Sequence, residues 1–373
     1  MTNRKALKSL INWVDMRNRS MLSSNLLGIS IDKFFMPSVA NIIGTDLSTY
    51  KLIMKNQFAC NPMHIGRDEK MPIALYREDT PSIVSPAYFV FEVKNTLELL
   101  PEYLMLWFKR AEFDRECWFH TDGSVRGGIT WEEILDMTIP VPSIDEQNQI
   151  VQQYNDINDR IRIKREVNDN LVASAQVTLL KLFSDNTDIP KQKITDFCFE
   201  IKAGGTPNRT MPIYWDNGQY PWVKNGEVKN NIIIDTEELI SQSGYENSSA
   251  KIVKKNSVLM AMYCVSTPQL AYTDIDVTTN QAVCAMTAHN KYQAAYLYYY
   301  LMFFGQDLIN DANGSAQINL SKELISNYSI PRPDDDTLLN MKLVANLEYR
   351  TQISKEIVAL TSFSQLLIAQ LSR

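Results

Sequence analysis

One group of residues has the types and spacing of a metal-dependent nuclease site. Asp79 lies thirteen residues before Glu92, and Lys94 follows two positions later. In such nucleases two carboxylates hold Mg²⁺ while a lysine supports the attacking water. The pattern is short, and residues 90–93 are predicted to form a strand whose outward positions are simply polar. A stand-alone nuclease that uses Asp79, Glu92 and Lys94 is therefore kept as an alternative hypothesis.

Other catalytic patterns are incomplete. Residues 85–88 (SPAY) resemble the Ser/Asn/Asp-Pro-Pro-aromatic loop of amino-methyltransferases, but the second proline is missing. The densest glycine group, residues 203–207 (AGGTP), has neither the spacing of a dinucleotide-binding loop nor the Lys-Ser/Thr of a phosphate-binding loop. His64, His120 and His289 have no histidine or carboxylate at metal-ligand spacing. The sequence therefore predicts no catalytic constellation, no metal site and no cofactor bound by this chain.

Polar loops that carry cations and side-chain amides are the remaining candidates. They cover residues 61–70, 124–128, 202–209, 222–225 and 313–317. Arginine can bind a guanine edge with two hydrogen bonds, asparagine and glutamine can do so for adenine, and lysine can hold phosphate. Each residue alone could belong to an ordinary surface turn, but the set recurs in corresponding places and predicts a DNA-facing surface. The predicted DNA-binding residues are Arg67, Lys70, Arg126, Arg209, Lys224, Asn225 and Gln317.

Composition sets limits on this surface. With 373 residues the chain exceeds one ordinary core and favours two domains, and 45% hydrophobic residues exclude a disordered chain. A net charge of −6 excludes a generally basic coat, although a local basic face remains possible. The five cysteines are far apart without a CxxC, which fits a reducing cytoplasm. No apolar run approaches the ~20 residues that cross a bilayer, and the N-terminus lacks the apolar segment of a signal peptide, so we expect a cytoplasmic protein without a membrane segment.

The chain contains an internal repeat. Residues 122–142 align without a gap with residues 313–333, at an offset of 191. Both segments contain a Gly-Ser pair near their start and an Ile-Pro pair near their end. Upstream, residues 101–108 match residues 294–301 at an offset of 193. The repeat predicts two similar α+β domains, with short strands such as 87–93 and 257–263 and helices such as 101–115 and 291–310.

A long segment with helical periodicity follows each copy. In the first, apolar residues recur in steps of three and four without internal Gly or Pro between 143 and 184, as in the seam of a coiled coil. A helix over residues 146–182 would be roughly 55 Å long. Each stripe could pack on its own domain, but pairing the two helices buries both. The predicted pairing residues are Ile150, Ile157, Ile161, Leu171, Ile353, Ile357, Leu360 and Leu367, with Leu347, Phe363 and Leu371 completing the second stripe.

Two further features of the pattern concern helices. Lys164 and Asn168 interrupt the first stripe, and polar residues at such positions usually fix the register of a helix pair. At the N-terminus, the apolar residues of segment 1–25 have helical spacing and predict an amphipathic helix. They are Leu7, Leu10, Ile11 and Val14.

The motifs of both copies resemble the specificity subunits of type I restriction-modification enzymes. The first copy carries residues 35–41 (FMPSVAN), 44–51 (GTDLSTYK), 58–67 (FACNPMHIGR), 83–91 (IVSPAYFVF) and 124–128 (SVRGG). The second carries residues 204–207 (GGTP), 214–215 (YW), 221–223 (PWV) and 313–315 (NGS). These motifs are similar to two common types of target recognition domain, and the resemblance covers nearly the whole chain.

The resemblance implies an α+β architecture with two similar target recognition domains separated by two long antiparallel coiled-coil helices. The expected boundaries are 1–142, 143–184 (helix), 185–333 and 334–373 (helix). Each domain would read one half of a split double-stranded DNA target, and the helices would set the spacer and dock two methyltransferase (modification) subunits. S-adenosylmethionine, ATP and Mg²⁺ are expected on these subunits and on motor-nuclease (restriction) subunits, while this chain is expected to be non-catalytic. A pure assembly protein that never touches bases is a third hypothesis.

Overall fold

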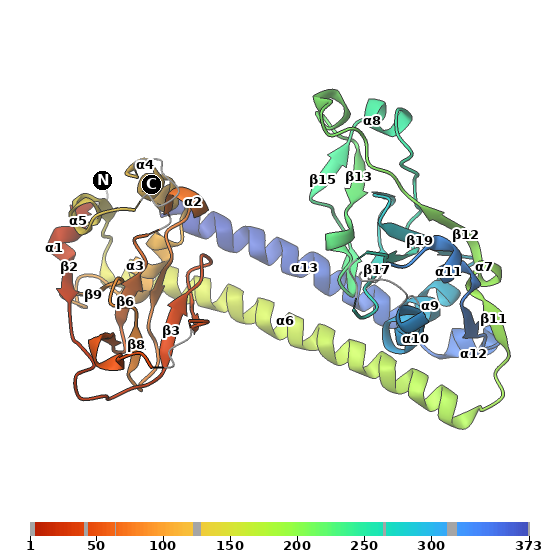
Figure 1. The fold of residues 1–373 in the computed structure, drawn as a ribbon, viewed down its shortest axis with the longest axis horizontal. Helices are drawn as coiled ribbons and strands as arrows, with labels where there is room; N and C mark the ends of the chain where they lie inside the picture. The colour runs from red at the N-terminus through yellow and green to blue at the C-terminus, as the bar shows by residue number, and fades with distance from the viewer. Residues whose placement is uncertain are drawn as a thin grey trace. The chain divides into compact units, whose positions relative to one another are not determined.

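The computed structural model describes residues 4–40, 44–63, 65–121, 128–263, 266–311 and 319–371. The chain forms two compact units, one made of Met1–Ile161 with Leu360–Arg373 and the other of Arg162–Ala359. Each unit holds one globular head and part of each of two long helices (Figure 1). We call residues 4–140 the first head and residues 191–331 the second head. No helix of the described residues is both long and apolar enough to cross a lipid bilayer.

The first head contains two four-stranded sheets, with strand orders β2-β9-β6-β7 and β4-β3-β8-β5. In the first sheet Phe58 and Phe91 lie opposite one another on neighbouring strands and stack with ring centroids 5.0 Å apart. Phe108 meets both rings edge-on, which packs helix α3 onto the sheet. The elements before the first long helix are β1 (Arg4–Ala6), α1 (Leu7–Leu10), β2 (Ile11–Val14), β3 (Leu26–Ile29), β4 (Phe35–Pro37), η1 (Leu47–Thr49), β5 (Lys51–Ile53), β6 (Gln57–Cys60), α2 (Ile65–Asp68), β7 (Ile73–Leu75), β8 (Ser82–Val84), β9 (Phe89–Val93), α3 (Pro101–Phe108), α4 (Ala111–Phe119), α5 (Trp131–Asp136) and β10 (Thr138–Pro140).

The N-terminal segment is not the amphipathic helix that its spacing predicts. Only residues 7–10 are helical, and strands β1 and β2 flank this single turn. Strand β1 pairs with β10, and β2 pairs with β9 along four residues. Leu7, Leu10 and Ile11 are buried as expected, but in a strand-turn-strand that extends the sheet. The prediction was wrong because long-range strand pairing outweighs local helical spacing.

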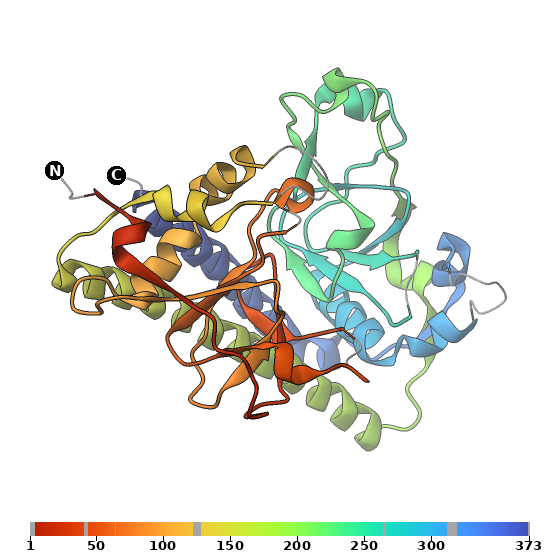
Figure 2. The same cartoon turned by 60° about the vertical axis from the view of Figure 1, so that its left-hand side comes forward.

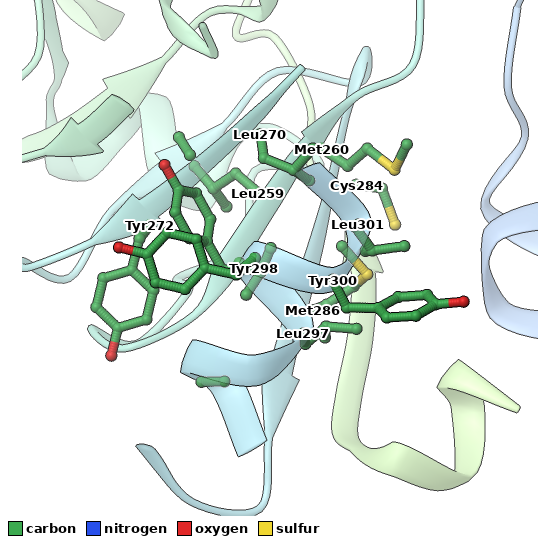
Figure 3. Packing of buried hydrophobic residues seen from close by; sticks show 14 of the residues in the cluster. Leu259, Met260, Leu270, Tyr272, Cys284, Met286, Leu297, Tyr298, Tyr300 and Leu301 are labelled. Carbon is green, nitrogen blue, oxygen red and sulfur yellow. The ribbon is translucent and has the colours of Figure 1, made fainter. Parts of the chain in front are cut away.

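The second head has a five-stranded sheet, β12-β19-β16-β17-β14, and a three-stranded sheet, β15-β13-β18. Helix α9 lies against the larger sheet (Figure 2). Its residues Leu297, Tyr298 and Leu301 pack on Leu259, Met260 and other strand residues (Figure 3). The elements are β11 (Lys191–Lys193), α7 (Ile194–Phe197), β12 (Cys198–Ala203), η2 (Pro212–Tyr214), β13 (Tyr220–Val223), η3 (Asn225–Glu227), β14 (Asn231–Ile233), β15 (Glu238–Ile240), α8 (Gln242–Glu246), β16 (Val258–Ala261), β17 (Leu270–Thr273), β18 (Thr278–Thr279), β19 (Val283–Ala288), α9 (Lys291–Phe304), α10 (Gln306–Asp311), α11 (Lys322–Asn327) and β20 (Ser329–Pro331).

The two heads share one topology. Strands β2, β9, β6 and β7 neighbour each other in the same order as β12, β19, β16 and β17. In the other sheet of each head β3 pairs antiparallel with β4 and parallel with β8, as β13 does with β15 and β18. A strand-turn-strand with a four-residue helix opens both heads, and its first strand pairs with the Ile-Pro strand that closes the head. The repeat found in the sequence is therefore a repeat of the fold.

The aligned segments form the same local structure at the same offset. Helix α5 and strand β10 match α11 and β20 residue for residue at 191 positions, and each helix is capped by a hydroxyl, from Thr130 or Ser321. A hydrogen bond also repeats, because the Tyr103 hydroxyl donates to the Pro140 carbonyl (3.2 Å) and that of Tyr296 donates to Pro331 (2.8 Å). The tyrosines thus connect α3 of the first head to β10, and α9 of the second head to β20, the last strand of each head before a long helix.

The long helices are α6 (Ile144–Asp185) and α13 (Leu343–Gln370), and a short α12 (Asp335–Asn340) precedes the second. The 42 residues of α6 give a length of about 63 Å. Within the second unit Lys164 of α6 forms an ion pair with Glu356 of α13, and the Leu171 carbonyl accepts a hydrogen bond from Asn346 (2.8 Å). The later residue of α6 contacts the earlier residue of α13, so the two helices are antiparallel. In the first unit Leu371, the residue that follows α13, belongs to the same apolar cluster as Tyr154 of α6.

The predicted stripe lies on the inner faces of these helices. Ile157, Ile161 and Ile353 are buried, and the other predicted pairing residues, Ile150, Leu171, Ile357, Leu360 and Leu367, are half-buried. The assignment of Phe363 was wrong, because its side chain is 57% exposed while Ser364 is 8% exposed. The buried face of α13 thus includes Leu360, Ser364 and Leu367. The apolar pattern of the sequence does not indicate Ser364, because serine is polar.

The buried cysteines provide a test of the two cores. Cys60, Cys117, Cys198 and Cys284 are free thiols inside the heads, and burial raises the pKa of Cys198 and of Cys284 to about 12. Because the thiolate is the reactive form, we expect none of the four to react with a thiol dye at neutral pH. The measurement uses a Cys264→Ser chain, before and after unfolding in urea. Rapid labelling of the folded chain would contradict the burial.

Candidate nucleic-acid interface

In the first head, the predicted loops 61–70 and 124–128 meet. Arg126 lies outside the described residues, but Gly128 packs so closely on Pro62 that an added Cβ would lie 2.7 Å from the Pro62 carbonyl oxygen. The amide of Ile129 donates to the same oxygen (3.2 Å). The chain that follows Arg126 is therefore attached to the loop that carries Arg67 and Lys70.

Two of the predicted DNA-binding cations of this head, Arg67 and Lys70, are described, and both are exposed and have acidic neighbours. Arg67, on α2, donates two hydrogen bonds to the Asp68 carboxylate (2.7 and 2.8 Å), and this carboxylate raises the pKa of Arg67. Lys70 lies 3.8 Å from Asp32 and lines a cleft of about 610 Å³. Deeper in that cleft, Lys33 forms an ion pair with Asp114 (2.6 Å) and is almost fully buried.

Two tryptophans support the glycine loop of the second head. The Trp222 indole donates to the Gly205 carbonyl (3.0 Å), and the Trp215 indole donates to the Asn208 carbonyl (3.2 Å). The rings meet edge-on, with centroids 5.1 Å apart. The Arg209 guanidinium lies 3.7 Å from the Trp215 ring centroid, within cation–π range. The guanidinium is also 4.8 Å from the Trp222 ring centroid, so both tryptophans contribute to its position.

Arg209 and Lys224 converge on one carboxylate. Glu238 accepts hydrogen bonds from both side chains, and Lys224 also forms an ion pair with Glu237 (2.7 Å). The hydrogen bond that Arg209 donates lowers the pKa of Glu238, and the hydrogen bonds that Lys224 donates to Glu237 and Glu238 raise the pKa of Lys224. The four charges cancel locally. Such an arrangement suits directional hydrogen bonding to a base edge better than general attraction of phosphate.

Asn225 and Gln317 complete the predicted set. Asn225 donates its side-chain N–H to the Tyr263 carbonyl (3.2 Å), while its side-chain oxygen is buried and has no hydrogen-bond partner among the described residues. Gln317 lies outside the described residues. Tyr263 pairs with Asn319, so the chain that follows Gln317 begins beside the Asn225 loop. DNA contact by any of these residues stays a prediction.

Sequence reasoning missed the residues that position these cations. Trp215 and Trp222 were noted only as parts of motifs, although an arginine near two tryptophans was a signal for stacking. Glu238 gave no signal, because it is 29 residues from Arg209 in the chain.

The nuclease triad is not assembled. Asp79 pairs with Lys55 (2.6 Å), Glu92 accepts from Gln57 (2.9 Å), and Lys94 donates to the Lys8 carbonyl (2.6 Å). Across the described ranges no group of three or more His, Cys, Asp or Glu side chains could hold a metal ion. The geometry therefore gives no support to the nuclease hypothesis.

A known family of protein domains matches both halves of the chain. Residues 45–172 and 186–357 match the type I restriction modification DNA specificity domain. The specificity subunit of the Escherichia coli type I restriction enzyme EcoR124I/EcoR124II is 23% identical over 137 residues, which are 35% of this chain and 34% of that protein. The Escherichia coli EcoprrI specificity subunit is 22% identical over 169 residues, 43% of this chain and 41% of its own length. The alignments thus span well under half of these curated relatives.

A solved structure extends the likeness to the whole fold. The S subunit of a type I restriction-modification system from M. genitalium matches with a TM-score of 0.58 at 15% identity, over 100% of this chain and 96% of that one. At this identity the match shows a shared fold. Because the family match covers both repeats, this chain belongs to the type I restriction-modification DNA specificity family.

Proposed function

We propose that this chain is the sequence-specific DNA-recognition subunit of a type I restriction-modification complex. Each head reads one half of a bipartite target in double-stranded DNA, and the antiparallel helices set the number of unread base pairs between the halves. The observation that carries the proposal is the duplication: two heads of one topology, each joined by the same module to a long helix. A rod of about 63 Å could span roughly 18 base pairs at 3.4 Å per pair, which leaves room for two readers about one DNA turn apart.

The proposal assigns the chemistry to partner proteins. Two modification subunits dock on the helices and bring S-adenosylmethionine, and restriction subunits bring ATP and Mg²⁺, so this chain itself is non-catalytic and acts where the DNA is, in the cytoplasm. The dispersal of Asp79, Glu92 and Lys94 over three separate partners supports this division.

Mapping of methylated bases in cells that contain this chain and its modification subunits tests the proposal. The expected motif has two short specified groups separated by a constant number of unspecified bases. One continuous motif, or modification without sequence preference, would overturn the two-reader function and favour the assembly-only hypothesis.

Arg209→Ala should weaken recognition at one position of the second half-site. Because the guanidinium is held by Trp215 and Glu238, its loss should cost ~1–3 kcal/mol of affinity for the preferred base and relax that position only. Lys254→Ala is the matched control, because it removes an exposed cation that pairs with Asp276 in the same head. Binding isotherms of the assembled complex on duplexes that differ at one base pair measure the effect, and equal losses on all duplexes would contradict base reading by Arg209.

A further inference from the structure

Arg350, on α13, is a cation in an almost fully buried position. Only 2% of its surface is exposed, and it is among the largest fully buried side chains. Among the described residues its guanidinium donates hydrogen bonds to Asn168, Tyr299 and the Asn230 carbonyl, and it lies 5.7 Å from the ring centroids of Tyr298 and Tyr299; none of these groups is a carboxylate. Burying an ion costs several kcal/mol, and an apolar residue of similar volume often gives equal or greater stability. Stability alone therefore does not explain an arginine here.

The guanidinium joins three parts of the second unit. It donates to Asn168 on α6 (2.9 Å), to the Tyr299 hydroxyl on α9 (3.1 Å) and to the Asn230 carbonyl in the loop before β14 (3.4 Å). Asn230 has the left-handed φ of 57°, and its side chain accepts from the Leu270 amide (3.0 Å), which holds the loop in this conformation. One planar group thus fixes both long helices to the second head.

A second layer of hydrogen bonds holds the partners in place. The Tyr299 hydroxyl donates to the side chain of Asn346, one turn before Arg350, and Asn346 donates to the Leu171 carbonyl on α6 (2.8 Å). The apolar core of the head includes Tyr299, which accepts from Arg350, together with Leu347 of α13 and Ala175 of α6. The network therefore borders the apolar core of the second head, where both long helices contact it.

We propose that Arg350 is a specificity-determining positioning residue for the spacer. It fixes the direction in which α6 and α13 leave the second head, and thereby the number of unread base pairs that the complex accepts. This inference rests on the proposed function and adds to it a named residue that controls spacer length. The planar fork of arginine suits the task because it sets angles among several acceptors at once, which an ammonium group cannot do.

The test compares Arg350→Met with Lys355→Met in the complex with modification subunits. Lys355 is the matched control, because it is a cation of the same helix whose ion pair with Asp274 is half exposed. Plasmids carry the target with its natural spacer, or with one base pair more or fewer. We expect Arg350→Met to raise methylation of the altered spacers relative to the natural one by about tenfold, as coupling energies of such networks allow. Arg350→Lys should not restore discrimination, and base preference within each half should stay unchanged.

An equal loss of methylation at all spacers, or unchanged discrimination, would overturn the proposal. Amide hydrogen exchange of residues 164–171 and 346–353 supplies a readout that needs no DNA. Exchange in this region should be faster in Arg350→Met than in Lys355→Met, and equal exchange would contradict the joint. If the unaltered chain modifies no bipartite sequence, the proposed function fails, and the exchange measurement still decides whether Arg350 holds the helices to the head.

Discussion

Replacing Ile353 with aspartate should destabilise the second unit by about 3 kcal/mol or more, because a carboxylate would be buried without a partner. Ile353 is 2% exposed on the inner face of α13, one turn beyond Arg350. Val358 lies on the same helix and is 50% exposed, so Val358→Asp introduces the same charge with little burial. Thermal unfolding followed by circular dichroism should show a large loss for the first variant and a change within ~0.5 kcal/mol for the second.

The pH dependence of the stability difference between the two variants tests whether a buried carboxylate causes it. A buried carboxylate has a folded-state pKa raised above its unfolded value. Its cost is therefore fully present above the folded pKa and falls as the pH decreases, since the folded state then binds more protons than the unfolded state. The stability gap between Ile353→Asp and Val358→Asp should narrow as the pH is lowered toward 5. A gap of zero at neutral pH would mean that the helix pair does not bury this position.

Substituting Gly204 with alanine should be nearly as damaging to the second head. An added Cβ would lie 1.9 Å from the Thr279 carbonyl oxygen and 2.3 Å from its hydroxyl oxygen. Thr279 cannot move easily, because it pairs with Val223 in the sheet and its carbonyl accepts from the Gly205 amide (2.9 Å). Overpacking of this kind typically lowers the free energy of unfolding by ~1–3 kcal/mol. Because the clash is with a backbone oxygen, we expect a loss near the upper end of this range.

Gly226 provides the control in the same head. It lies in the short helix η3, and no heavy atom lies within 4 Å of an added Cβ. Urea unfolding should show a lower midpoint for Gly204→Ala and little change for Gly226→Ala. Equal midpoints would mean that the glycine loop does not pack on Thr279 as described, and the placement of Arg209 beside it would then be in doubt.

Local signals in the sequence predicted those parts of the fold that local interactions determine. The gap-free match of residues 122–142 with 313–333 predicted the same local structure in both copies, and the helix and Ile-Pro strand of each copy confirm it. Local spacing gave the wrong prediction for the N-terminal segment. The spacing of Leu7, Leu10 and Ile11 fits a long helix, but it also fits a single helical turn followed by a strand. Residues 11–14 form a strand because they pair with residues 90–93, about 80 positions away in the chain.

The candidate interface shows the same limit. The sequence indicated which loops carry cations and amides, and the structure brings loop 61–70 against Gly128 and Arg209 beside Lys224. The carboxylate that joins the last two, Glu238, could not be predicted, because the contact depends on how β13 and β15 pair. Likewise, Asn168 was recognised as a polar interruption of the stripe, but nothing local linked it to Arg350, 182 residues away.

Exchange of one head is the most direct measurement of how recognition is divided. Residues 190–335 are replaced by the corresponding segment of another member of the family, and the methylated motif is mapped in cells with the same modification subunits. If each head acts as an independent reader, one half of the motif changes while the other half keeps its bases. A motif unchanged in both halves, or altered in both, would show that the two heads do not divide the target between them.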